Sequence, residues 1–204
     1  MKRSLIIFLH GVGSNGDSLA PLGEVWRHSL PDTLFAAPNA PMPFDMGPGY
    51  QWFSVYGVTP ENRTQRVLAA RLAFDGLIAR IMAEQGMAGH PERVVLVGFS
   101  QGSIMALDAI ASGRWPVAAV VAFSGRLSSP LPLMPAAATP VLLIHGADDQ
   151  VIPAWETEHA GKALQETGVA ATTFILPRVG HEISAEGVAL AGQFISRTFA
   201  AVAK

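Results

Sequence analysis

Residues 93–104 read RVVLVGFSQGSI, and this stretch decides the fold. An apolar run ends in GFSQG, residues 98–102, and a helix-forming segment, 103–112, follows. The G-x-S-x-G pattern is typical of a sharp turn from strand to helix, on which a serine hydroxyl projects from the sheet. Glycine two residues on either side of Ser100 leaves room where a side chain would collide with neighbouring backbone. The stretch therefore predicts a nucleophilic serine at such a turn, with an idle serine in an ordinary turn as the alternative.

Short apolar runs alternate with longer amphipathic stretches along the rest of the chain. Runs nearly continuous in Val, Ile, Leu, Phe and Ala are typical of strands that are buried on both faces. The expected strands are 5–9, 33–37, 93–98, 117–123, 141–145 and 172–176, and the expected helices are 18–29, 61–86, 101–112, 154–167 and 184–202. This alternation predicts an α/β fold with a mainly parallel sheet, flanking helices and right-handed crossovers.

The composition limits the classes of protein to consider. With 204 residues and no repeat, charge block or linker, the chain is expected to form a single domain over 1–204. A formal net charge of −2 gives no basic field for nucleic acid or for an anionic membrane surface. The chain has no cysteine, which excludes disulfides, thiolate chemistry and Cys-ligated zinc and fits a reducing compartment.

The N-terminal segment MKRSLIIFLHG imitates a signal peptide only briefly. Its apolar run, 5–9, is shorter than the roughly 7–15 residues of a signal-peptide core, and no small-x-small cleavage pattern follows. No segment approaches the roughly 20 apolar residues that span a bilayer. We therefore expect a cytoplasmic protein without membrane insertion.

A nucleophilic serine needs a base, and the base needs an orienting acid. Asp148 and Asp149 follow the expected strand 141–145, and His181 follows the last expected strand. The chain order Ser, Asp, His is that of α/β-hydrolases, and open α/β sheets build their sites at the carboxyl ends of strands. The pattern predicts His181 as the base and leaves the choice between the two aspartates open.

Two other histidines, His10 and His145, each precede a glycine where an expected strand ends. We expect both of them to be buried and structural. The other three histidines lie in predicted surface helices or turns, which leaves His181 as the base.

The loop that follows the first expected strand contains Gly11, Gly13 and Gly16. Their G-x-G-x-x-G spacing is found in dinucleotide-binding loops, which also require an acidic residue at the end of the second strand. The nearest acid here, Asp32, precedes that strand. The loop is therefore interpreted as part of an oxyanion hole, with the backbone N–H groups of Val12 and Gln101 as donors.

Residues 37–60, APNAPMPFDMGPGYQWFSVYGVTP, form an unusually long connection. Loops of this length in compact domains are usually functional. Its aromatic residues predict a folded wall beside the site, although they could instead only pin the loop to the body. The expected substrate-binding residues come from this loop, from the Pro-rich segment 124–140 and from the position beside the acid: Met46, Tyr50, Trp52, Phe53, Leu127, Leu131 and Ile152.

Five segments resemble the phospholipase/carboxylesterase family of α/β-hydrolases, which includes bacterial carboxylesterases and acyl-protein thioesterases: FLHGVGSNG, APNAPMPFDMGPGYQWFSV, VVLVGFSQG, LLIHGADDQVIP and VGHEISAEGVALAGQFI. The resemblance implies that Ser100 is the nucleophile and His181 the base. The family's H-G-x-x-D-x-x-V-P pattern, laid on residues 145–153, implies that Asp149 is the acid. It also implies that Trp52 lies by the acyl cleft.

The resemblance also implies the α/β-hydrolase fold. The chain starts at the strand that leads to the oxyanion loop, so the first strands of the larger fold are expected to be absent. About six parallel strands would then remain, with 33–37 at one edge.

The expected reaction is hydrolysis of a small-molecule acyl ester through an acyl-enzyme, with no metal or organic cofactor. The alternatives are an acyl-thioesterase, a lysophospholipase or an acyltransferase. A non-catalytic ligand-binding relative would usually lack a triad member, whereas all three candidates are present here. An apolar surface near the Pro-rich segment is expected either to form a homodimer contact or to be the mouth of the site.

Overall fold

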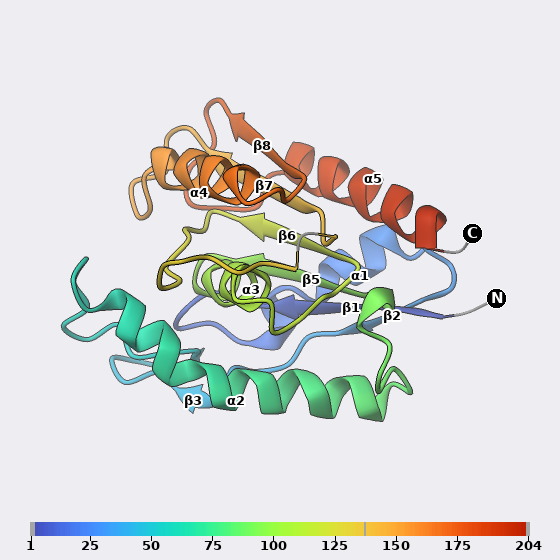
Figure 1. The fold of residues 1–204 in the computed structure, drawn as a ribbon, viewed down its shortest axis with the longest axis horizontal. Coiled ribbons are helices and arrows are strands. Elements are labelled where there is room, and N and C mark those ends of the chain that lie inside the picture. Colours follow the sequence, from blue (N-terminus) through green and yellow to red (C-terminus); the bar gives the residue numbers. More distant parts are fainter. Residues whose placement is uncertain (1–2, 137, 203–204) are drawn as a thin grey trace.

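A parallel β-sheet forms the centre of the computed structural model, which describes residues 3–136 and 138–202 (Figure 1). Its six strands lie in the order β2-β1-β5-β6-β7-β8, and all neighbouring pairs are parallel. Their bounds are Ser4–Leu9 (β1), Thr33–Ala36 (β2), Val94–Phe99 (β5), Ala119–Phe123 (β6), Val141–Gly146 (β7) and Ala171–Leu176 (β8). The predicted number of parallel strands and the edge position of the second strand are confirmed.

Helices cover both faces of the sheet, as the alternation predicted (Figure 1). Their bounds are Ala20–Trp26 (α1), Arg63–Glu84 (α2), Gln101–Ala111 (α3), Ala154–Glu166 (α4) and Ala185–Val202 (α5). Helices α2, α3 and α4 pack into one hydrophobic cluster, and α1 and α5 pack into the other. None of the helices in the described part of the chain combines the length and apolar composition that crossing a membrane requires.

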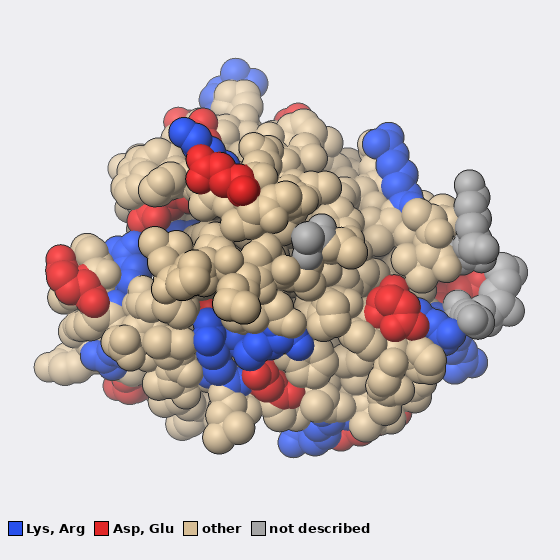
Figure 2. Space-filling view, in the orientation of Figure 1, with Lys and Arg blue, Asp and Glu red and all other residues tan. Residues whose placement is uncertain are grey.

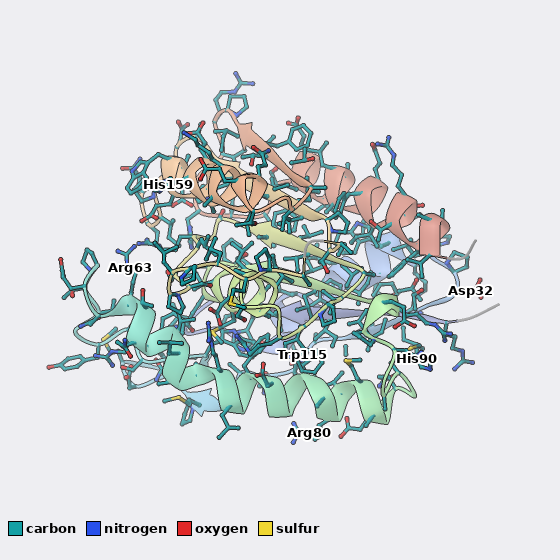
Figure 3. The ribbon with its side chains drawn as sticks, viewed as in Figure 1. Asp32, Arg63, Arg80, His90, Trp115 and His159 are labelled. Carbon is teal, nitrogen blue, oxygen red and sulfur yellow. The ribbon has the colours of Figure 1, made fainter. Side chains whose placement is uncertain are left out.

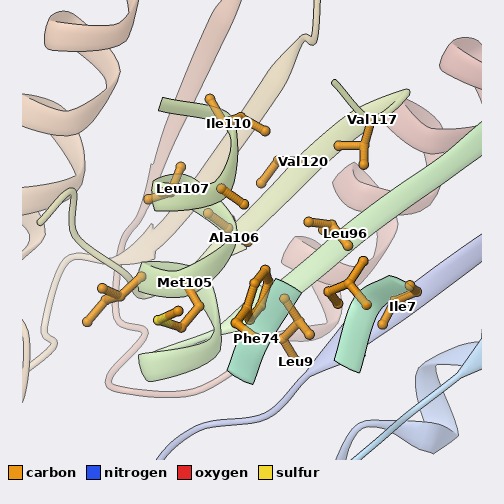
Figure 4. Packing of buried hydrophobic residues seen from close by; sticks show 14 of the residues in the cluster. Ile7, Leu9, Phe74, Leu96, Met105, Ala106, Leu107, Ile110, Val117 and Val120 are labelled. Atoms are coloured by element: carbon orange, nitrogen blue, oxygen red, sulfur yellow. The ribbon is translucent and has the colours of Figure 1, made fainter. Parts of the chain in front are cut away.

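Alternate residues of each central strand point into the two clusters. In β1, Ile7 and Leu9 face the cluster shown in Figure 4, whereas Ile6 and Phe8 face the opposite one. All four side chains are at most 1% exposed. Burial on both faces explains why these strands read as continuous apolar runs, because neither set of alternate side chains meets water.

The register aligns the carboxyl ends of the strands along one edge of the sheet. Leu9 pairs with Gly98, and Gly146 at the end of β7 pairs with Leu176 at the end of β8. The residues that follow these strands therefore meet in space although they are distant in sequence.

Helix α3 lies between α2 and the sheet, and all of its residues are buried. Its one charged residue, Asp108, is fully buried and accepts hydrogen bonds from four donors. Both carboxylate oxygens bind Arg71, at 2.7 and 2.9 Å, while Arg114 and the Ser129 hydroxyl lie at 3.0 and 2.7 Å. These contacts tie α3 to α2 and to the Pro-rich segment.

Burial alone would raise the pKa of Asp108. The hydrogen bonds from Arg71 and Ser129, together with the charge and hydrogen bond of Arg114, outweigh this effect and lower the pKa below its ordinary value. The carboxylate is therefore an ionised structural anchor of α3.

Two regions differ from the sequence-based expectation. The helix expected over 18–29 is instead a short 3₁₀ turn, Gly16–Ser18, followed by α1. Helix α1 ends at Trp26 because the chain turns there to enter the edge strand β2, and the Leu30 N–H donates to the Trp26 carbonyl in this turn. The long connection contains a small antiparallel pair of strands, Met42–Pro43 (β3) and Tyr50–Gln51 (β4). The sequence did not predict these strands, because the connection shows no alternation of apolar residues.

Candidate active site

Ser100 lies on the tight turn between β5 and α3. Its φ of 51° and ψ of −114° are strained for a residue other than glycine. A Cβ on Gly98 would lie 2.5 Å from the Ser103 nitrogen, and a Cβ on Gly102 would lie 1.9 Å from the Leu9 carbonyl oxygen. Only glycine fits at these two positions, which is the steric reason for the G-x-S-x-G spacing.

His181 reaches Ser100 from the loop between β8 and α5. Its Nε2 lies 2.9 Å from the Ser100 Oγ, and its Nδ1 lies 2.7 Å from Oδ2 of Asp149. The aspartate follows β7, so the three side chains come from three different strand ends. The structure thus brings together the serine, the histidine and one of the two aspartates singled out in the sequence.

Asp149 and Asp148 have different environments. Asp149 is 6% exposed, and its Oδ1 accepts the N–H groups of Val151 and Ile152 at 2.8 and 2.9 Å. Burial would raise its pKa, but the hydrogen bonds from His181, Ile152 and Val151 prevail and lower it. Asp148 is exposed. The aspartate that contacts His181 is therefore Asp149, held as an anion.

The loop after β1 closely approaches the turn that holds Ser100. A Cβ on Gly11 would lie 3.2 Å from the Phe99 ring, and Gly13 adopts a positive φ of 73°. Within the described residues, the backbone N–H groups of Val12 and Gln101 donate to no protein acceptor. Neither amide is thus engaged by the described part of the protein, and Val12 lines the cavity at Ser100.

A family model described as phospholipase/carboxylesterase matches residues 1–199. This chain belongs to the phospholipase/carboxylesterase family. It is therefore a hydrolase, and the serine hydrolase class fits this family. The fold is the α/β-hydrolase fold of the family, as the sequence predicted.

Named relatives extend the match. The chain is 34% identical to Esterase YpfH of Escherichia coli (strain K12), over 89% of this chain and 77% of the relative. It is 29% identical to Acyl-protein thioesterase 1 of Emericella nidulans, over 83% of this chain and 79% of the relative. The solved structure of esterase PE8 has a TM-score of 0.88 and 38% identity, and the match covers 96% of this chain and 93% of that one.

In this phospholipase/carboxylesterase family member, a second histidine contacts the aspartate. His145 is buried, and its Nε2 lies 3.0 Å from Asp149 Oδ2 and 2.8 Å from the Ile152 carbonyl oxygen. Its Nδ1 lies 2.7 Å from the Thr157 hydroxyl. The sequence predicted a buried structural histidine, and His145 is buried, but only the fold shows that it supports the acid loop.

The side chain of Gln101 anchors the long connection to the nucleophile turn. Its Oε1 accepts the Trp52 N–H at 2.8 Å, and its Nε2 donates to the Phe53 carbonyl at 2.7 Å. The sequence had singled out only the backbone of Gln101. Its side chain explains how a loop of this length is held beside the site.

His10 and Trp52 complete this anchor. His10 Nε2 accepts the Ala40 N–H at 2.9 Å, and Nδ1 donates to the Gly11 carbonyl at 2.7 Å, which defines a neutral ring. Burial lowers the pKa of His10, which also favours the neutral form. The indole N–H of Trp52 donates to the His10 carbonyl at 2.8 Å. The long connection is therefore locked to the loop after β1.

Ser100 and His181 open onto a cavity of about 480 Å³. Its other lining residues are Gly11, Val12, Ser14, Ser18, Leu19, Phe99, Val151, Glu182 and Ile183. None of the seven residues expected to bind substrate lines this cavity. Its walls come instead from the loop after β1, the residues around His181 and Val151.

The structure corrects the expectation for the substrate wall. Trp52, Phe53 and Ile152 are only 2, 6 and 5% exposed, so they belong to the core. Met46 and Leu131 are largely exposed, whereas Tyr50 and Leu127 are half-buried. For Trp52 the physical reason is its indole hydrogen bond together with packing against Phe74, at a ring-centroid distance of 5.6 Å. Trp52 and Phe53 therefore anchor the loop to the body, whereas Tyr56 in the same loop is exposed.

Proposed function

We propose that the protein hydrolyses carboxylic esters through an acyl-enzyme intermediate on Ser100. The observation that carries this proposal is the position of His181, with one ring nitrogen 2.9 Å from the Ser100 Oγ and the other 2.7 Å from Asp149. A base in contact with both a nucleophile and an orienting acid is the arrangement that activates a serine hydroxyl.

In the acylation step, the Ser100 Oγ attacks the ester carbonyl carbon while His181 Nε2 accepts its proton. Negative charge develops on the former carbonyl oxygen, and the Val12 and Gln101 amides are the proposed donors that stabilise it. Asp149 holds the imidazole with its proton on Nδ1 and stabilises the imidazolium. His181 then gives its proton to the departing alkoxide.

In the deacylation step, water takes the place of the alcohol. The water oxygen attacks the acyl carbon while His181 accepts a proton from the water. The bond between the acyl carbon and the Ser100 oxygen then breaks, and His181 returns the proton to Ser100. The products are a carboxylic acid and the free enzyme. These steps require no group beyond the side chains and amides named here.

The test is kcat/KM for p-nitrophenyl esters from acetate to palmitate, measured on the wild type and on Ser100→Ala side by side. The proposal expects turnover that disappears with Ser100→Ala, and labelling of the wild type but not of the variant by a fluorophosphonate. Equal turnover by the two proteins would contradict it.

Hydrolysis of acyl thioesters is the second candidate, because the same triad chemistry cleaves both bonds. It is favoured by the similarity to a protein named Acyl-protein thioesterase 1. A paired assay with an oxygen ester and a thioester of the same acyl group separates the two candidates. A higher kcat/KM for the thioester would favour this second function.

A further inference from the structure

Two arginines share a single carboxylate beside the candidate active site. The guanidinium groups of Arg126 and Arg63 lie 2.9 and 3.1 Å from the same oxygen, Oε1 of Glu156. The side chains are 15, 26 and 13% exposed, respectively. Among the described residues, no other carboxylate lies within ion-pair distance of either arginine. One positive charge is therefore left without a matching negative charge in a largely buried position.

This cluster adjoins the nucleophile turn. The Phe123 carbonyl, at the end of β6, accepts the Ser100 N–H at 2.9 Å and the Ser103 hydroxyl at 2.7 Å. Gly125 packs so closely on Ser103 that a Cβ on it would lie 2.5 Å from the serine Cβ. Arg126 is the next residue, so its backbone is held against the first turn of α3.

The same cluster adjoins the acid loop from the other side. Glu156 immediately precedes Thr157, whose hydroxyl donates to the Gly125 carbonyl at 3.0 Å and contacts His145. His145 in turn contacts Asp149. The chain at Arg126 and Glu156 is therefore tied on one side to the first turn of α3 and on the other to His145, which contacts Asp149. The charge of Asp149 also acts on Arg126. Figure 3 places Arg63 at the edge of the molecule where α2 begins, and Figure 2 shows basic side chains reaching the surface there.

The electrostatics agree with an unmatched charge. The pKa of Arg126 is lowered, mainly because the group is buried, and the nearby charge of Arg63 lowers it further. The negative charges of Glu156 and Asp149 act in the opposite direction but do not prevail. Asp149 is already engaged by His181 and two amides. In the same segment, the buried hydroxyl of Ser124 has no hydrogen-bond partner among the described residues. An excess charge and an unpaired polar group thus occur together beside the site.

We propose that Arg126 and Arg63 bind an anionic group, a carboxylate or a phosphate, carried by the ester substrate. This inference rests on the proposed esterase function and names its substrate class. The planar guanidinium fork matches carboxylate and phosphate oxygens, and such charge-assisted hydrogen bonds are stronger in a partly buried position than in water. The anionic group belongs to the part of the substrate that extends from the reacting carbonyl toward β6 and α4.

Two pairs of esters test the proposal and locate the charge. Methyl hydrogen glutarate and methyl valerate differ by a carboxylate on the acyl half. 4-(Butyryloxy)benzoate and its methyl ester differ by a carboxylate on the alcohol half. Hydrolysis of each ester is followed by pH-stat titration. The measured quantity is the ratio of kcat/KM for the charged ester to kcat/KM for the neutral ester of the same pair.

In Arg126→Gln this ratio is expected to fall about 10- to 100-fold for one of the two pairs, which is the effect of losing one hydrogen bond to a charged group. Arg63→Gln should lower it for the same pair, and Arg126→Lys should restore it in part. Arg80→Gln is the matched control, because Arg80 is a largely exposed residue of α2 paired only with Glu84 among the described residues. In the wild type the ratio should also fall with added salt.

Ratios that stay unchanged in both arginine variants, for both pairs, would overturn the inference while leaving the esterase proposal intact. If the wild type hydrolysed no ester, the esterase proposal would fail separately. Glutarate binding to Ser100→Ala, measured by calorimetry, would then decide the inference. Binding that Arg126→Gln abolishes supports it, and absence of binding overturns it.

Discussion

Two buried aspartates of this protein have similar burial and different partners. Asp108 in α3 and Asp149 after β7 are 0 and 6% exposed, both have a lowered pKa, and each is surrounded by four donor groups. The difference lies in the donors. Arginines hold Asp108, whereas an imidazole that also contacts Ser100 holds Asp149.

An arginine keeps its proton at any pH that a protein meets, so its pairing with Asp108 is static. In the proposed mechanism His181 takes the proton of Ser100, so Asp149 would stabilise a charge that appears only during the reaction. The partner, rather than burial of the acid, thus separates the structural carboxylate of Asp108 from the one to which we assign a role in the proposed reaction.

The largest expected effect is on the imidazole and its serine. Ser100→Ala and His181→Ala should each lower kcat by on the order of 10⁴- to 10⁶-fold, because triad members act as a unit. Steady-state kinetics on a p-nitrophenyl ester measures this, with circular dichroism as the control for folding. If either variant kept most of its activity, the catalytic assignment would be wrong.

The next effect compares the two neighbouring aspartates. Asp149→Asn should lower kcat by about 10⁴-fold, because an amide favours the wrong imidazole tautomer. Asp148→Asn is the control and should change kcat little, since its side chain is exposed. The opposite ranking would transfer the role of the acid to Asp148.

Asp108→Asn should act on stability instead of chemistry. Removing the carboxylate leaves Arg71 without its ion-pair partner, whereas Arg114 keeps its pair with Asp75. Breaking a buried pair costs about 3–5 kcal/mol. Urea unfolding should show this loss, and kcat at temperatures where the variant is folded should stay close to that of the wild type. A large fall in kcat with unchanged stability would remove the distinction between the two aspartates.

The smallest expected effect is on the pH dependence of stability. Because the folded pKa of both aspartates is lowered, each contributes stability above the unfolded pKa of about 3.9, and this contribution is lost as the pH falls through the folded pKa. Thermal unfolding between pH 6 and acidic pH (roughly 3) should show this decline. Asp108→Asn should flatten it, because an asparagine does not titrate, and a decline as steep as that of the wild type would contradict the assigned pKa direction.

The fold and the centre of the site follow closely from local sequence patterns. The strand and helix positions came from apolar periodicity, and the turn at Ser100 came from the pattern of glycines at 98 and 102. The clash that requires glycine at 98 is with Ser103, a few residues along the chain, whereas the clash at 102 is with Leu9 of β1. The order Ser, Asp, His at strand ends placed three residues that the fold then brings together, because parallel strands deliver their carboxyl ends to one edge of the sheet.

The substrate wall and the buried polar partners depend on contacts between distant segments, and no local pattern contains them. From the sequence alone, an aromatic residue is equally compatible with a position in a pocket wall and a position in the hydrophobic core. The indole hydrogen bond from Trp52 to the His10 carbonyl is what places Trp52 in the core. In the same way, Arg71 in α2 meets Asp108 in α3 only after the helices pack.

The sequence by itself determined the α/β architecture, the serine turn and the choice of His181, since these follow from periodicities within segments, from the glycine pattern and from the order of residues at strand ends. The residues around the two aspartates left the choice between them open, and the family resemblance implied Asp149. Only the tertiary structure shows that Asp149 contacts His181, that His145 contacts Asp149, and that Arg63 and Arg126 share Glu156. Neighbouring residues leave a strand end in different directions, and which of them meets a partner depends on how separate elements pack.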